Sequence, residues 1–260
     1  MPLSFLLALT PPQIELLGGG VLALMLLRWI HTVAGILWVG LLYYLNLVSA
    51  PFLQELDPQT RITVVPKLMS RALWWFRWSS VVTVLVGTAY WMHIVGTDVR
   101  NAVAAGQPAS GGTITGSFFL IWTLAFAVEM GILMSPAEFL RKGPVLGVLV
   151  ALIVLAASYV FLSLNQHGWE TNRALTIGIG GGLGWFMMMN VWGIVWRMHK
   201  KIIRWTEAAA RGEAMPAEYS RVAHLALLTS RVNFWLSFPI SCPGPSGGFV
   251  GAPSLPCWSA

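Results

Sequence analysis

A short apolar stretch near the start of the chain holds side chains that could carry chemistry. Within residues 28–40, His31, Gly35 and Trp38 recur at helical spacing, so they lie on one helix face. An ionisable group at membrane depth is costly unless it finds a partner. This face therefore combines an imidazole, a small residue and an aromatic plate, which is a composition that could hold a cofactor.

A second histidine, His93, lies in the next long apolar run. Each histidine lies toward the same end of its run, so we expect the two imidazoles to lie at similar depth. Two imidazoles from neighbouring helices are typical axial ligands of a b-type haem, which also needs an apolar, aromatic slot. The sequence thus predicts haem b held by His31 and His93, with Trp38 lining the slot. In the alternative interpretation, each histidine is an interfacial residue hydrogen-bonded to water or backbone. His167 is a third histidine at this end.

Glu129 and Asn190 are polar residues well inside two other apolar runs, at comparable depth. They could form a proton path or contact a substrate. They could instead form a polar clasp between two helices, which the sequence slightly favours. Arg28 and Arg77 could pair with haem propionates or with an anionic substrate. The two arginines fall near opposite membrane faces, so they cannot both serve one small ligand.

Other kinds of site find no support in the sequence. Cys242 and Cys257 match no metal-binding spacing and no haem-attachment motif, so no metal site is predicted. The glycines of residues 178–184 follow no strand and precede no Lys-Ser/Thr pair, which argues against a phosphate loop. Close helix packing explains these glycines better.

The amino-acid composition indicates which secondary-structure elements position these residues. Hydrophobic residues make up 56% of the 260 residues and charged residues only 10%, against about 25% in soluble domains. Lipid must therefore be part of the solvent, and we predict an all-α, polytopic transmembrane helix bundle. Runs near the length of a spanning helix occur at residues 22–49, 74–96, 117–135, 144–164 and 174–198, with a partial sixth at 233–240.

The remaining segments differ in character from these runs. Residues 1–21 form an N-terminal segment before the membrane bundle of residues 22–199. Residues 200–232 mix charges with Ala and Leu, which predicts an amphipathic helix along the cytoplasmic surface, interrupted near residues 212–216. Residues 241–260 are rich in Gly and Pro and could not continue the last span. We interpret this tail as a frameshift or truncation of a longer parent.

The basic residues are distributed unequally between the two ends of the predicted bundle. Thirteen of the sixteen lie in loops at one end, and the other end holds only Arg28, Arg100 and Arg173. The positive-inside rule then places the basic loops in the cytoplasm and the N-terminus in the periplasm of a bacterial inner membrane. The net charge of +6 is explained by these loops, so the expected partner is the lipid bilayer and not nucleic acid.

Four stretches together resemble one family. They are residues 27–40, 72–78, 173–191 and 230–239. They are similar to the urate oxidase N-terminal domain, the membrane domain of bacterial urate hydroxylases that carry a C-terminal cytochrome c. The resemblance implies urate oxidation in purine catabolism, with electrons passed to a c-type cytochrome.

Few of the family's site residues are retained in this chain. Only His31, Asn190 and the tryptophans match position by position, and Trp74 and Gly178 stand at or near positions where the family has histidines. The alternative is therefore a non-catalytic accessory subunit of a larger membrane electron-transfer complex, which could still bind haem.

Overall fold

The computed structural model describes residues 19–241, and these residues form an all-α bundle. They are 88% helical and contain no strand, which confirms the predicted fold class. The N-terminal segment up to residue 18 and the Gly/Pro-rich tail from residue 242 lie outside the described residues.

Five helical stretches within this range are long and apolar enough to cross a membrane, as predicted. Two of them contain more than one element, because short π-helical turns continue a helix without breaking its direction. The elements are α1 (Gly19–Tyr43), η2 (Tyr44–Ser49), α2 (Ala50–Glu55), α3 (Pro58–Ala104), α4 (Gly111–Met134), η3 (Glu138–Arg141), α5 (Gly143–Leu164), α6 (Asn172–Asn190), η4 (Val191–Val195), α7 (Trp196–Ala210) and α8 (Tyr219–Ser241).

The longest helix, α3, extends well beyond any membrane span. Its 47 residues correspond to about 70 Å at 1.5 Å per residue, against about 30 Å for the hydrocarbon core. Asp57 caps its first turn by accepting hydrogen bonds from the backbone N–H of Gln59 and Thr60, both at 3.0 Å. Hydrogen bonding from Thr60 holds the pKa of Asp57 below its ordinary value. Helix α3 is therefore more than twice as long as the hydrocarbon core is thick.

The chain after the fifth span differs from the predicted surface segment. The predicted interruption near residues 212–216 is present, since α7 ends at Ala210 and α8 begins at Tyr219. However, α7 continues the line of α6 through η4, and α8 starts ahead of the predicted start at residue 233. Ile202 and Thr206 bury one face of α7, and α7 packs against both α3 and α8. The charges on α7 favour a helix lying on the membrane surface. In the structure, however, the apolar face of α7 is covered by α3 and α8.

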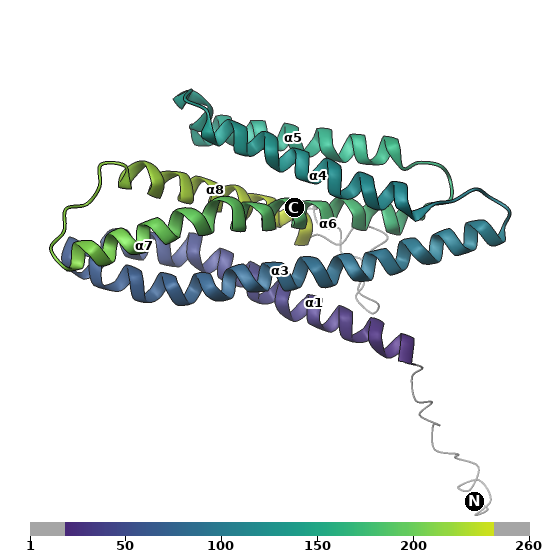
Figure 1. Cartoon of the computed structure of the whole chain (residues 1–260), viewed down its shortest axis with the longest axis horizontal. Coiled ribbons are helices and arrows are strands. Elements are labelled where there is room, and N and C mark those ends of the chain that lie inside the picture. Colours follow the sequence, from purple (N-terminus) through teal and green to yellow (C-terminus); the bar gives the residue numbers. More distant parts are fainter. Residues whose placement is uncertain (1–18, 242–260) are drawn as a thin grey trace, which may run out of the picture.

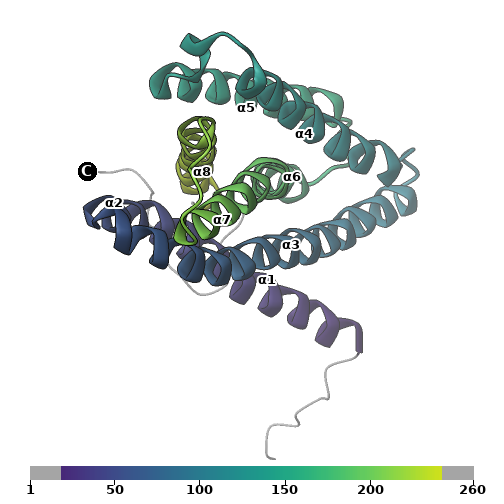
Figure 2. The ribbon, with the colours of Figure 1, turned by 60° about the vertical axis from the view of Figure 1, so that its left-hand side comes forward.

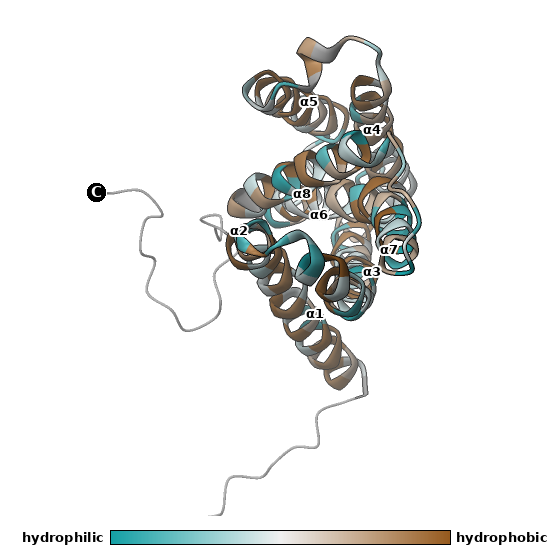
Figure 3. Cartoon of the chain, turned by 90° about the vertical axis from the view of Figure 1, so that its left-hand side faces the viewer, coloured by the Kyte–Doolittle hydropathy of each residue, from teal (hydrophilic) through white to brown (hydrophobic). Residues whose placement is uncertain are grey.

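The helices lie roughly along one axis in three tiers (Figure 1). The α4–α5 hairpin forms one side, α1 lies on the opposite side against α3, and α6, α7 and α8 run between them (Figure 2). Apolar residues dominate the outer helices α1 and α5, while hydrophilic residues gather on α7 (Figure 3). The outer faces are therefore suited to lipid.

Two hydrophobic clusters hold the bundle together. One joins α3, α4, α5 and α6 around Trp91, Phe118, Trp122 and Phe161. The other joins α1, α3, α6, α7 and α8 and includes Trp38. Helices α3, α6 and α8 contribute to both clusters and so connect the two sides of the bundle.

Two glycines on α6 pack directly against aromatic rings, which confirms close helix packing as their role at these positions. A Cβ placed on Gly178 would lie 2.6 Å from the Phe161 ring, and one on Gly182 would lie 1.8 Å from Nε1 of Trp122. Each ring therefore occupies space that any other residue would fill.

We predict that Gly182→Ala destabilises the protein by about 1–3 kcal/mol, because the methyl group overlaps the buried Trp122 ring. Gly180→Ala is the matched control on the same helix, since nothing lies within 4 Å of its added Cβ. That change should be neutral, or stabilising by up to about 1 kcal/mol through helix propensity. Thermal unfolding in detergent measures both variants, and equal melting temperatures would contradict this packing.

Candidate functional site

His31 is held against α3 by one hydrogen bond and by close packing of its imidazole ring on a glycine. Its Nδ1 lies 2.8 Å from the backbone oxygen of Thr83. One turn further along α3, a Cβ on Gly87 would lie 2.7 Å from the imidazole, so the ring fills the space that Gly87 leaves. Thr83 and Gly87 are four residues apart and share one face of α3. The seat therefore depends on how α1 and α3 are aligned.

This arrangement defines the chemistry that the imidazole can offer. A carbonyl oxygen only accepts hydrogen bonds, so Nδ1 must carry the hydrogen, and the neutral ring keeps a lone pair on Nε2. Metal-bound histidines are commonly oriented by this type of hydrogen bond. His31 is exposed on the α1 side of the bundle. Its Nε2 is therefore the atom available to a ligand.

The structure does not bring His93 to this imidazole. His93 is exposed and lies six residues beyond Gly87, about 9 Å further along the axis of α3. The two helices are aligned so that Arg28 meets Tyr90 and His31 meets Thr83. The equal depth expected from the ends of the apolar runs is not observed, because His31 lies nine residues inside the start of its run at residue 22, and His93 lies three residues inside the end of its run at residue 96.

The other residues of the predicted haem slot lie apart from His31. Trp38 is 3% exposed and packs in the cluster between α1, α3 and α7, and its Nε1 finds no partner among the described residues. Nδ1 of His167 lies 2.7 Å from the Glu170 carboxylate in the loop before α6. Among the residues described, no group of three or more His, Cys, Asp or Glu side chains is placed to hold a metal ion.

The two arginines have separate environments. Arg28 donates from Nε to the hydroxyl of Tyr90 at 2.8 Å. The guanidinium of Arg77 lies over the ring of Trp196, 3.9 Å from its centroid, with Trp78 and Trp192 also nearby. Thirteen residues of α3 separate Tyr90 from Arg77, which corresponds to about 20 Å. As the sequence predicts, the two cations cannot serve one small ligand.

Glu129 belongs to a fully buried polar chain that links α4, α6 and α8. Glu129, Asn190 and Asn233 are each 0% exposed. Asn233 donates from Nδ2 to the backbone oxygen of Met187, and Asn190 donates from Nδ2 to Oδ1 of Asn233, each at 3.0 Å. Asn190 is also the side chain that meets the Glu129 carboxyl.

The backbone fixes the direction of this chain of hydrogen bonds. The Met187 carbonyl requires a donor, which sets the orientation of the Asn233 amide and then that of Asn190. No donor within residues 19–241 lies within hydrogen-bond distance of Oδ1 of Asn190 or of the two carboxyl oxygens of Glu129. The two buried side chains lie together between α4 and α6, and their role as a clasp stays a prediction.

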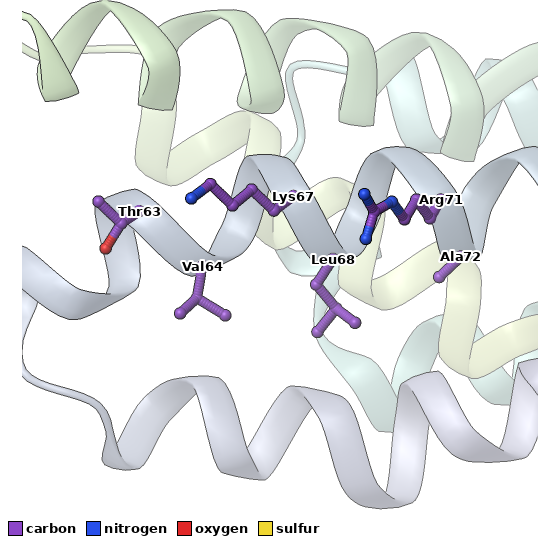
Figure 4. Close-up of a pocket in the computed structure, with 6 residues that line it drawn as sticks. All are labelled: Thr63, Val64, Lys67, Leu68, Arg71 and Ala72. Carbon is purple, nitrogen blue, oxygen red and sulfur yellow. The ribbon is translucent and has the colours of Figure 1, made fainter.

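Two open grooves flank the basic half of α3. One, of about 410 Å³, is lined only by α3 residues and carries Lys67 and Arg71 one turn apart (Figure 4). The other, of about 390 Å³, carries Lys200 and Arg204 of α7. Neither groove is lined by a predicted site residue. Their cations are suited to the headgroups of anionic lipids.

Sequence reasoning missed the partners that give the predicted residues their roles. Gly87 and Thr83 seat His31, Asn233 orients Asn190, and Tyr90 receives Arg28. The polar residues inside α8 and α3 were a visible signal for Asn233 and Tyr90. The glycine had no such signal, since its role depends on a ring from another helix.

No protein-family model, curated protein or solved structure matches this chain.

Proposed function

We propose that the chain is a redox-linked protein of a bacterial inner membrane that binds a b-type haem through His31. The observation that carries the proposal is the seat of His31, with Nδ1 hydrogen-bonded to Thr83 and the ring resting on Gly87. This seat fixes the tautomer and leaves the lone pair of Nε2 for a metal. When bound, haem supplies one-electron transfer.

The residues fit one axial ligand within a single copy of the chain. His93 lies about 9 Å from Gly87 along α3, and His167 and His199 are hydrogen-bonded to Glu170 and to the Val195 carbonyl. His31 is exposed on α1, which packs chiefly against α3. Completion of the site by another chain is therefore part of the proposal. The exposed position favours an accessory subunit over an enzyme whose site is enclosed in this chain.

The family resemblance suggests which electron donor and which electron acceptor the protein uses. It points to urate as the electron donor and to a c-type cytochrome as the acceptor. His31 and Arg28 lie toward the end of the bundle that is poor in basic residues. The positive-inside rule assigns this end to the periplasm, where such a cytochrome would approach.

Membranes containing the chain and its co-purifying partners test this function. We expect urate-dependent reduction of added cytochrome c, lost in His31→Ala and retained in His167→Ala, whose side chain binds Glu170. Reduction by a quinol but not by urate would support the accessory subunit. Cytochrome reduction that is unchanged in His31→Ala would contradict the proposal.

A further inference from the structure

Two arginines from distant parts of the chain converge on one hydroxyl group. Arg28 on α1 donates to the Tyr90 hydroxyl through Nε at 2.8 Å and also through Nη2. Arg173, in the first turn of α6, donates to the same oxygen through Nη2 at 2.7 Å. These two are among only three basic residues at this end of the bundle, the third being Arg100. Like charges are thus gathered where cations are scarce.

No carboxylate balances this pair within the described residues. The nearest acidic groups along the same elements are engaged elsewhere: Asp98 accepts from the backbone N–H and the hydroxyl of Thr171, and Glu170 pairs with His167. Neither arginine forms an ion pair with a described residue. The positive N-terminus of α6 adds to the same field.

The hydrogen-bonding groups left without a partner at this point are donors. The Tyr90 oxygen accepts from both guanidinium groups, so its own O–H is polarised and has no acceptor among the residues described. Arg28 and Arg173 are exposed and Tyr90 is partly exposed, so a ligand can reach all three. A cluster of donors and positive charge without an acceptor is complementary to an oxyanion.

We propose that Arg28, Tyr90 and Arg173 form a binding site for a phosphate group. Arginine forks match the geometry of phosphate oxygens, and the tyrosine O–H supplies a further donor between them. Trp29 and Ile30, beside Arg28, are 70% and 45% exposed, which provides apolar surface for an acyl chain next to the charge. The headgroup of an anionic phospholipid and free phosphate share this chemistry. The site uses none of the atoms assigned to haem ligation and does not depend on it.

Native mass spectrometry of the purified protein tests this site by counting phosphatidylglycerol molecules bound per chain. We expect Arg28→Gln/Arg173→Gln to bind one phosphatidylglycerol fewer than the wild type, with at least a tenfold loss for the tightest one. Tyr90→Phe, which removes only the hydroxyl, should weaken the same molecule with little effect on folding. Arg100→Gln is the matched control, because Arg100 bonds only within its own helix, to Thr97.

Two further measurements distinguish lipid bound at the two ends of the bundle and distinguish a lipid headgroup from free phosphate. Lys200→Gln/Arg204→Gln should lose lipid at the basic end and keep the molecule that depends on Tyr90. Protection from unfolding by inorganic phosphate, lost in the double arginine variant, would support the site with a soluble ligand. Equal retention of phosphatidylglycerol and phosphatidylcholine, or wild-type binding by the double variant, would overturn the proposal. Lipid binding should be unchanged in His31→Ala, so failure of the haem proposal would not affect this test.

Discussion

Gly87→Ala is expected to weaken haem binding about tenfold to a hundredfold, although residue 87 carries no side chain that could touch a ligand. A methyl group at this position would lie 2.7 Å from the imidazole of His31, so the ring must leave its seat. The hydrogen bond from Nδ1 to Thr83 would then be lost or misaligned. Changes in the groups that orient a metal-binding histidine have effects of this size. Haem retained per chain after purification is the measurement.

Gly40→Ala is the control for this prediction. Gly40 lies on α1 itself, and nothing lies within 4 Å of a Cβ added there. Haem content in that variant should match the wild type. If Gly87→Ala also retained full haem content, the seat on α3 would not be what orients His31.

Asn190→Leu is expected to lower the free energy of unfolding by about 2 kcal/mol or more, although it conserves shape. Leucine removes the donor to Oδ1 of Asn233 and the polar amide that meets the Glu129 carboxyl. Both partners are 0% exposed, and each buried group left without a partner costs about 1–3 kcal/mol. Chemical unfolding in detergent micelles, followed by circular dichroism, measures the change.

Two variants show whether the loss comes from this network. Asn101→Leu, at the exposed end of α3, should change stability by less than about 0.5 kcal/mol. Glu129→Gln should remain close to the wild type, because the glutamine amide can donate to Oδ1 of Asn190. A double-mutant cycle of Glu129→Ala with Asn190→Ala should show coupling above about 0.5 kcal/mol. Additive losses would mean that the two side chains do not interact.

The membrane spans could be predicted from sequence because the signal is local. A run of about twenty apolar residues identifies a spanning helix whatever its neighbours are. The ends of the helices could not be predicted in the same way. The first half of α3 carries Lys67 and Arg71 and has no apolar run, yet it remains helical because Val65, Met69 and Leu73 bury one face in the bundle. Hydropathy does not detect an extension of this kind beyond the lipid.

The residues of the candidate site also differ in whether they could be predicted from the sequence. His31 could be found from sequence because an imidazole in an apolar run is unusual. Gly87, which seats it, lies on another helix and depends on how the two helices are aligned. The same alignment separates His93 from His31. The clasp between Glu129 and Asn190 could be anticipated from depth alone, but Asn233 entered it because α8 returns beside α6.

The absorption spectrum of the purified protein tests the central claim most directly. We expect a Soret band and haem b α- and β-bands in the wild type, absent in His31→Ala and present in His199→Ala, whose ring is bound to the Val195 carbonyl of its own helix. Circular dichroism would confirm that each variant is folded. A folded wild-type protein without a Soret band, isolated with its partners and a haem supply, would contradict the account, as would a full band in His31→Ala.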